Sequence, residues 1–250
     1  MYNLSHNINS AYPVLFDLHT HSISSGHGTT DTVSALIQSA CKKGLFLLGI
    51  SDHGPATKGS ALPSYFRGLK YAKKNRFGIE ILYGAELNII DMEGRVDLED
   101  NVLQGLDYAF ISIHPPIFTP YEHNDLTSVY VKAMNHPKVR FLGHIDDDRF
   151  PVDFEALLLH AKAKGIYPEI NNGSLMPNAY RVGGQKNCRS ILKICKNIQL
   201  PILLSSDSHG SKNIGNMEYI YPLLEEQNFP KDLVLNCHLQ SLKKITDYKK

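Results

Sequence analysis

The sequence predicts a single α/β domain built from repeated strand–helix units, and three observations lead to this fold class. Short apolar runs rich in β-branched residues alternate with longer segments of helical period. The chain has 250 residues, and a single (β/α) barrel typically needs about 250. With 42% hydrophobic and 20% charged residues, the composition fits a globular protein with a sizeable core rather than a disordered chain.

The expected elements follow one another in a regular order. Seven runs predict strands: Val14–Leu18, Phe46–Ile50, Glu80–Tyr83, Tyr108–Ile113, Val139–Leu142, Ile166–Glu169 and Pro201–Leu204. Six segments between and after them predict helices: Asp31–Lys43, Ser64–Lys74, Leu126–Asn135, Asp153–Lys164, Lys186–Asn197 and Met217–Gln227. Asp31 is expected to cap the first helix, and Gly44 and Gly165 stand where a glycine would end a helix before the next strand. Residues 1–13 are expected to form an N-terminal leader, and residues 14–250 the domain.

Composition and charge disfavour several other classes of protein. The 26 Lys and Arg residues are balanced by 25 Asp and Glu residues, so no basic excess indicates nucleic-acid binding. The four cysteines form no CxxC pair and are too sparse for a secreted disulfide framework. Cys188 and Cys195 fit buried core thiols better than a redox pair. Because neither a signal peptide nor an apolar stretch of roughly 20 residues is visible, we expect a cytoplasmic protein without a membrane segment.

Residues that can bind metals follow the predicted strands, one strand after another. They are His19 and His21, Asp52 and His53, Glu86, His114, His144, Glu169, and Asp207 and His209. The carboxyl ends of parallel barrel strands all point to one face, where barrel active sites are built. Residues that are scattered over much of the sequence are therefore expected to share one pocket.

The residue types and their spacing predict a metal centre. His19-x-His21 places two imidazoles on one side of the chain, and Asp207-x-His209 repeats that spacing. Nine residues of ligand type are enough for two or three ions: His19, His21, His27, His53, Glu86, His114, His144, Asp207 and His209. Two metal ions about 3.5–4 Å apart can polarise a phosphoryl oxygen and lower the pKa of a bridging water. The remaining histidines have helix or loop contexts and are expected to bind no metal: His6, His123, His136, His160 and His238.

These motifs resemble those of the PHP (polymerase and histidinol phosphatase) family. The first two are Asp17-Leu18-His19-Thr20-His21 and Ser51-Asp52-His53-Gly54-Pro55. The later ones are Gly84-Ala85-Glu86, Ile113-His114-Pro115, Gly143-His144 and Ser206-Asp207-Ser208-His209. The resemblance runs from about Asp17 to Ser211, with a weaker match at Val234-Leu235-Asn236. His27, Glu169-Ile170-Asn171-Asn172 and Asn187-Cys188-Arg189 are similar to segments of the stand-alone trinuclear-zinc phosphatases of this family.

The resemblance implies a fold and a set of ligands. The fold would be a distorted, TIM-like (β/α)7 barrel in one domain. One ion would be bound by His19, His21, Glu86 and Asp207, and a second by Glu86 as a bridge with His114 and His144. His27, His53 and His209 would bind a third. Zinc fits this imidazole-rich set, and manganese or iron could replace it.

The expected function is that of a metal-dependent phosphomonoesterase acting on a small phosphorylated metabolite. A metal-bound hydroxide would attack phosphorus, with Glu86 and Asp207 as the catalytic carboxylates of the di- or trinuclear site. Asp17 and Asp52 are expected to orient ligand histidines from behind. Arg149, Lys58 and Arg181 are candidates to contact the phosphate.

Three other functions stay open at this point. A phosphodiesterase or 3′–5′ exonuclease could use the same site, although the near-neutral charge disfavours nucleic acid. Histidinol-phosphatase activity would share both fold and site. A metal-binding regulator without turnover is the third, but a purely structural zinc site usually closes with four ligands. Ile145-Asp146-Asp147-Asp148 also departs from the His-Pro-Gly that relatives often have after this histidine, and its charge could affect substrate choice.

Overall fold

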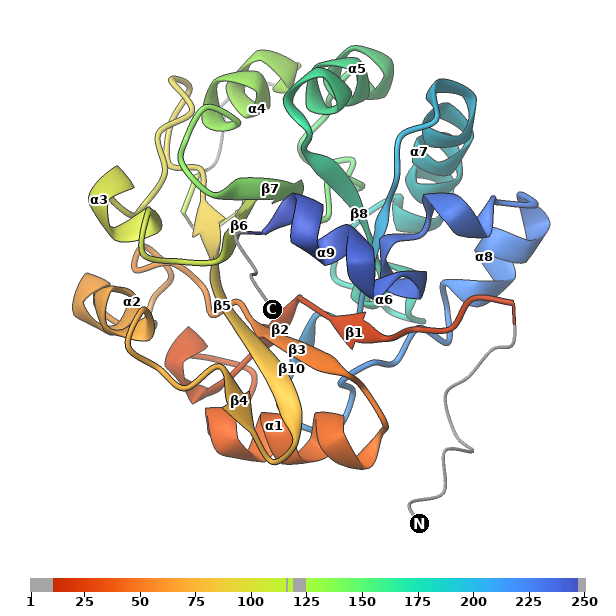
Figure 1. The fold of residues 1–250 in the computed structure, drawn as a ribbon. Helices are drawn as coiled ribbons and strands as arrows, with labels where there is room; N and C mark the ends of the chain where they lie inside the picture. Colours follow the sequence, from red (N-terminus) through yellow and green to blue (C-terminus); the bar gives the residue numbers. More distant parts are fainter. Residues whose placement is uncertain (1–10, 116, 119–124, 247–250) are drawn as a thin grey trace.

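A parallel β-sheet curls into a nearly closed barrel at the centre of the molecule, with helices around its outside (Figure 1). This computed structural model describes residues 11–115, 117–118 and 125–246. The strands of these ranges are β1 (Phe16–Asp17), β2 (Thr20–His21), β3 (Leu47–Ile50), β4 (Asn75–Arg76), β5 (Ile79–Asn88), β6 (Tyr108–Ser112), β7 (Val139–Leu142), β8 (Tyr167–Asn171), β9 (Leu203–Ser205) and β10 (Ser208–His209). The barrel sheet has the order β1-β3-β5-β6-β7-β8-β9, and β4 adds an antiparallel edge to β5. This architecture confirms the predicted barrel.

Helices follow most of the barrel strands. They are α1 (Val33–Lys42), α2 (Pro63–Leu69), α3 (Asp100–Leu103), α4 (Thr127–Ala133), α5 (Phe154–Lys164), α6 (Asn172–Leu175), α7 (Gly184–Ile198), α8 (Tyr221–Glu226) and α9 (Leu239–Ile245). Short 3-10 helices lie at η1 (Ile23–Ser25), η2 (Lys231–Leu233) and η3 (Leu235–Cys237). Within the described ranges, no helix has the length and apolar character needed to cross a lipid bilayer.

Each predicted helix and strand has a counterpart in the structure, but several ends differ; the last predicted helix, for example, begins at Tyr221 instead of Met217. Thr32, not Asp31, caps α1, because its side chain accepts a hydrogen bond from the Ala35 amide while Asp31 binds Ser211. The second helix ends at Leu69 instead of Lys74, since the chain then turns into β4. The third strand extends to Asn88, so Glu86 lies inside it. Gly165 ends α5 and Gly44 follows α1, both at positive φ as glycine allows.

Two hydrophobic clusters lie on the two faces of the barrel sheet. On β6, Tyr108 and Phe110 belong to one cluster, whereas Ala109 and Ile111 belong to the other. The first cluster fills the barrel interior, and Leu242 and Ile245 of α9 pack against its end. The second lies between the sheet and the outer helices, where Cys188 and Cys195 of α7 are buried as free thiols. Strand alternation therefore supplies both cores from the same short sequences.

Two devices complete the barrel between its first and last strands. β1 and β9 are joined through Asn236, whose side-chain amide donates to the Phe16 and Leu204 carbonyls and accepts from the Leu204 amide. Further along the chain, β2 and β10 pair in parallel, with His21 opposite His209. This second pairing brings the first and last groups of predicted metal ligands together at one end of the barrel.

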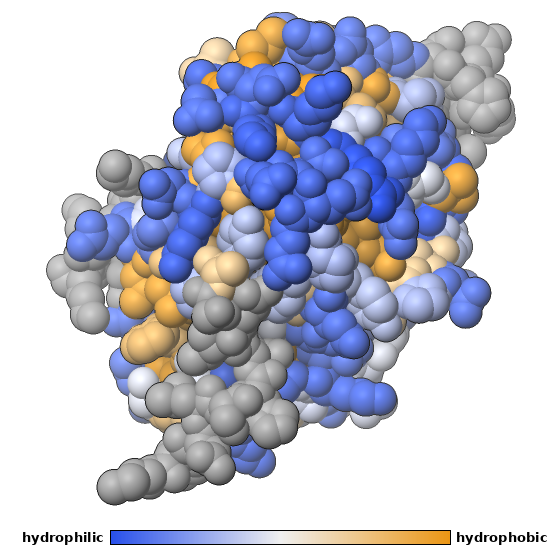
Figure 2. Space-filling view, turned by 90° about the vertical axis from the view of Figure 1, so that its right-hand side faces the viewer, coloured by the Kyte–Doolittle hydropathy of each residue, from blue (hydrophilic) through white to orange (hydrophobic). Residues whose placement is uncertain are grey.

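The outer surface is mainly polar on the face that carries α7 and α8. Figure 2 shows hydrophilic side chains over most of this face, with hydrophobic residues in scattered patches. Of the expected leader, residues 1–10 lie outside the described part of the chain, as do His6 and His123.

Candidate metal centre and substrate pocket

Glu86 lies at the centre of the candidate site. Its carboxylate is buried on β5, and five imidazoles approach its two oxygens at 2.7–3.5 Å: His19, His21, His53, His114 and His144. These histidines come from five different places near strand ends, so the barrel topology creates the cluster. His144 and Asp207 have positive φ values of 29° and 51°, a sparsely populated conformation that is common at functional sites.

Three sets of side chains bring their ligand atoms close enough to share an ion. The sets are His19, His21 and Asp207; His53, Glu86 and His114; and His21, His53 and His209, with ligand atoms no more than 4.8 Å apart in each set. His27 stacks on His53 and on His209, with ring centroids 4.8 and 5.0 Å apart. His144 joins through its Nε2, which lies 2.8 Å from Glu86 Oε1. All nine predicted ligands therefore lie together.

Buried hydrogen bonds orient several of these imidazoles. The Nδ1–H of His19 donates to Glu169 Oε1 at 2.6 Å, and that of His114 to Asn88 Oδ1 at 2.7 Å. The Nδ1–H of His21 donates to Ser25 Oγ, whose hydroxyl donates to Asp52. When such a ring is neutral, the proton on Nδ1 leaves the Nε2 lone pair directed at the centre.

The two predicted supporting aspartates differ in what they hold. Asp52 acts on His21 only through Ser25, and it also accepts from the Tyr65 hydroxyl at 2.6 Å. Asp17 contacts no imidazole ring: it accepts from the amides of His19 and Gly215 and from Ser206. Asp17 therefore ties the backbone of the first ligand segment to the segment that carries Asp207.

Several ligand atoms are buried in ion-pair contact with one another but make no well-directed hydrogen bond to any described residue. They are Nε2 of His19, His21 and His209, Nδ1 of His53 and Oε2 of Glu86. These five atoms converge, and the contacts that the side chains make with one another leave their lone pairs poorly satisfied by hydrogen bonds. Because imidazole nitrogens and a carboxylate oxygen are the donors that Zn²⁺, Mn²⁺ and Fe²⁺ accept, the arrangement fits divalent metal ions.

The electrostatics of the metal-free cluster reflect the opposite charges in it. Burial raises the pKa of the Glu86 carboxyl, but His53, His19 and His114 outweigh it and hold that pKa well below its usual value. Burial likewise opposes ionisation of Asp207, yet His19 and Arg181 lower its pKa. Burial and the neighbouring His209 and His53 lower the pKa of His21. Both carboxylates are thus anionic at neutral pH and ready to bind cations.

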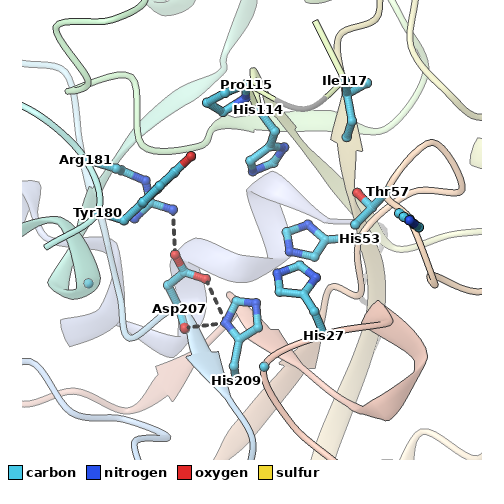
Figure 3. Close-up of a pocket in the computed structure, with 13 residues that line it drawn as sticks. His27, His53, Thr57, His114, Pro115, Ile117, Tyr180, Arg181, Asp207 and His209 are labelled. Atoms are coloured by element: carbon cyan, nitrogen blue, oxygen red, sulfur yellow. Dashed lines mark hydrogen bonds and ion pairs between the residues drawn. The ribbon is translucent and has the colours of Figure 1, made fainter.

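A cavity of about 600 Å³ opens above this cluster (Figure 3). His53, His114, Asp207 and His209 form one side of it, together with the exposed His27. Of the three predicted phosphate-contacting cations, Lys58 and Arg181 line the cavity, whereas Arg149 does not. Arg181 donates to Asp207 Oδ2 at 2.8 Å. Arg149 binds Asp147 instead, and its contact with substrate stays a prediction.

The acidic segment after His144 is directed away from the cavity. None of Asp146, Asp147 and Asp148 is among the described residues that line it. Asp146 is buried and accepts from Ser174, and Asp148 accepts from Asn187. Their charges are therefore used in packing the loops around the site, not in repelling a ligand inside it.

The model of the PHP domain family matches residues 17–171. This match covers more than half of the sequence and includes seven of the nine predicted ligands. The chain belongs to the PHP family.

Curated relatives of this PHP protein match along almost their whole length. A protein of Clostridium acetobutylicum named "Probable phosphatase" is 36% identical over 236 residues, which are 94% of each chain. A "Probable phosphatase" of Thermoanaerobacter sp. is 36% identical over 238 residues, covering 95% of this chain and 96% of its own.

Solved structures confirm the barrel of this PHP domain. A crystal structure from Listeria monocytogenes, assigned as a histidinol phosphatase, aligns with a TM-score of 0.62 at 20% identity, covering 82% of this chain and 99% of its own. The histidinol phosphate phosphatase of Lactococcus lactis, solved with zinc, L-histidinol and phosphate, aligns with a TM-score of 0.59 at 18% identity, covering 86% and 94%.

Three residues that the PHP site uses were not among the predicted ligands or supporting residues. Glu169 holds His19 and also accepts from the His144 amide at 2.7 Å. Asn88 holds His114, and Ser25 holds both His21 and the His53 amide. Glu169 stood at the end of a predicted strand, which is a usable signal. Asn88 and Ser25 offered none, because their roles depend on contacts across the barrel.

Proposed function

We propose that this PHP protein is a metal-dependent phosphomonoesterase that acts on a small phosphorylated metabolite. The observation that carries the proposal is the convergence of five buried ligand atoms that lack well-directed hydrogen bonds, beneath a cavity of about 600 Å³. Two cations, Lys58 and Arg181, line the same cavity. Metal charge and fixed cations together suit the oxyanions of a phosphate ester.

The nine ligand residues suit three ions. His19, His21, Glu86 and Asp207 would bind the first; Glu86, His114 and His144 the second; and His27, His53 and His209 the third. Zinc suits this imidazole-rich set, with manganese and iron as replacements. Bound divalent ions supply Lewis-acid charge for phosphoryl oxygens and lower the pKa of water.

The chain's own residues would bind and orient the substrate. Arg181 is held by Asp207 Oδ2, where its guanidinium can donate to a phosphoryl oxygen over the ligand cluster. Lys58, from the loop before α2, would contact the phosphate from another side. Pro115 and Ile117 give the cavity apolar walls, which limit water around the reacting group.

Phosphate release from a generic monoester and a generic diester, measured in parallel, tests this proposal. Metal-loaded wild type is expected to hydrolyse the monoester faster, and His19→Ala to lose that activity together with bound metal. His160→Ala is the matched control, because His160 is exposed on α5 and bonds only its own helix. Turnover of the diester alone would replace the proposal with a phosphodiesterase. No turnover of either ester, with metal bound, would contradict it.

Histidinol phosphate belongs in the same assay. The Lactococcus protein of the same fold was solved with L-histidinol and phosphate, so histidinol phosphate is a defined member of the substrate class. A kcat/KM for it far above that of generic monoesters would narrow the proposed function to a histidinol phosphatase.

A further inference from the structure

The acidic turn that departs from the family pattern positions a loop at the edge of the cavity. This loop, residues 176–183, carries Tyr180 and Arg181, which both line the cavity. The Asp148 amide donates to the Val182 carbonyl at 2.8 Å, and the Val182 amide donates to Asp147 Oδ1 at 3.3 Å. Both backbone groups of Val182, the residue after Arg181, are therefore hydrogen-bonded to the acidic turn.

Arg149 of the same turn supports Tyr180 from behind. Its guanidinium binds the Asp147 carboxylate through two nitrogens, with distances of 2.5–3.0 Å. The guanidinium carbon lies 4.3 Å from the centroid of the Tyr180 ring. Since Arg149 does not line the cavity and Tyr180 does, the cation covers the part of the ring that is turned away from the substrate site.

The Tyr180 ring is unusually available for a large aromatic side chain. Tyr180 is 72% exposed, although an ion pair and two backbone hydrogen bonds hold the segments around it. Figure 3 shows it beside Arg181, on the opposite side of the cavity from Thr57 and Ile117. A ring that is already positioned loses little conformational entropy when a ligand stacks on it.

We propose that Tyr180 determines specificity by stacking on a planar, unsaturated ring in the alcohol part of the phosphomonoester, while Arg149 and Asp147 position Tyr180. The proposal rests on the proposed function and adds a substrate class to it. Arg181 adjoins Tyr180 in the sequence, so one loop would contact both the phosphate and the ring. Aromatic stacking contributes about 2- to 12-fold in affinity beyond the area it buries.

A matched pair of esters isolates this effect. Benzyl phosphate and cyclohexylmethyl phosphate share a carbon skeleton and a primary alcohol, but only the first has a planar ring. Simple hydrophobic burial would favour the cyclohexyl ester, because it has more apolar surface. Wild type is expected to favour benzyl phosphate in kcat/KM by about 2- to 12-fold. Equal values, or a preference for the cyclohexyl ester, would overturn the proposal.

Four variants assign the preference to its source. Tyr180→Leu is expected to remove the preference and Tyr180→Phe to keep it, because only the second retains an aromatic ring. Arg149→Leu is expected to reduce it. Tyr71→Leu is the matched control, since Tyr71 is 79% exposed and does not line the cavity, and it should keep the wild-type ratio. An unchanged ratio in Tyr180→Leu would contradict the stacking, and an unchanged ratio in Arg149→Leu would contradict the positioning.

Binding of the two matching phosphonates separates this inference from the proposed function. Benzylphosphonate and cyclohexylmethylphosphonate cannot be hydrolysed, so calorimetry with metal-loaded protein measures recognition alone. If neither phosphate is turned over, but benzylphosphonate binds more tightly and Tyr180→Leu loses the difference, the phosphatase proposal fails and the stacking stands. If both esters are hydrolysed and the phosphonates bind equally, the stacking fails alone.

Discussion

Glu86 carries more of the site than any other single residue, because both of its oxygens face imidazoles. Oε1 lies 2.8 Å from His144 and 3.4 Å from His114, and Oε2 lies 2.7 Å from His53. A carboxylate can bridge two metal ions through two oxygens, whereas an imidazole offers one lone pair at a time. The proposed second ion therefore depends on Glu86 as much as the first does.

Replacing Glu86 by Gln keeps the shape of this side chain and removes its charge. Mutating a residue that only supports a metal ligand already costs about 10–100-fold in metal affinity or activity. For Glu86→Gln we therefore expect kcat/KM to fall by more than about 100-fold and fewer ions to be bound. Steady-state kinetics and elemental analysis measure the two effects. Glu155→Gln, at an exposed position on α5, is the control. Activity like that of wild type in Glu86→Gln would exclude a bridging role.

The direction of the pKa shift of His19 predicts how metal affinity depends on pH. Burial lowers the pKa of His19, but the Glu169, Glu86 and Asp207 carboxylates outweigh it and raise that pKa well above its usual value in the metal-free protein. At neutral pH the ring is protonated and must lose its proton to bind a metal ion. Metal affinity should therefore rise with pH through the neutral range.

Calorimetric titration with zinc in buffers of different ionisation enthalpy measures this proton release. At least one proton should leave per first ion bound at pH 7, and Glu169→Gln should reduce the number because it lowers the His19 pKa. Zinc binding that releases no protons at pH 7 would show that His19 is already neutral in the metal-free protein.

At the scale of elements, the barrel sheet is interrupted between β1 and β9, which are the two ends of its strand order. Residues near β1 and β9 do not pair directly there; the segment 233–236 lies between them instead. The Ile202 amide donates to the Leu233 carbonyl, and the Leu15 amide donates to the Asn236 carbonyl. The buried side chain of Asn236 completes the hydrogen bonds that a neighbouring strand would otherwise make.

Asn236→Leu should destabilise the fold because it keeps the volume but removes these bonds. The Leu204 amide and the Phe16 carbonyl would lose their partners, at about 1–3 kcal/mol for each buried group. We expect the free energy of unfolding, measured by urea denaturation, to fall by about 2–4 kcal/mol. Asn197→Leu, at an exposed position on α7, should change it by no more than about 0.5 kcal/mol. An equal effect of both substitutions would show that Asn236 does not close the barrel.

At the scale of the whole molecule, the metal site connects the two ends of the chain. Its ligands come from β2 at one end and from β10 at the other, and these two strands pair only with each other. The site lies at the point where the barrel closes. Metal ions bound there would add to the hydrogen bonds that already join these segments, such as those of Asp17 with Ser206 and Asp31 with Ser211.

Removing the metal should therefore lower the stability of the whole protein as well as its activity. A ligand that binds only the native state contributes about 3–4 kcal/mol when its free concentration is 100- to 1,000-fold above Kd. We expect the chelated protein to melt at a lower temperature in a thermal scan and to recover both its melting temperature and its turnover when zinc is added back. A melting temperature that does not respond to zinc would show that the folded protein binds the ion no more tightly than the unfolded chain does.

The amino-acid sequence by itself determined the class of fold and the set of candidate metal ligands. Alternation of apolar runs and helical segments requires a parallel sheet, and parallel strands place their carboxyl ends on one face. Any metal-binding residues that follow those strands must then gather, which is why the nine candidate ligands could be expected to lie together. The predicted strand boundaries were also close to the observed ones, because short apolar runs bounded by turn residues have few other structures open to them.

Only the tertiary structure decided how these residues are supported and what surrounds them. Glu169, Asn88 and Ser25 hold imidazoles that lie far away in the sequence, and Arg149, which was expected to contact phosphate, supports Tyr180. The sequence shows that the turn at 146–148 is acidic, but not that its side chains are directed away from the cavity. Sequence periodicity tells which face of a strand is buried, but the partner of a loop side chain depends on where distant loops come together, and that is set by the packing of the whole barrel.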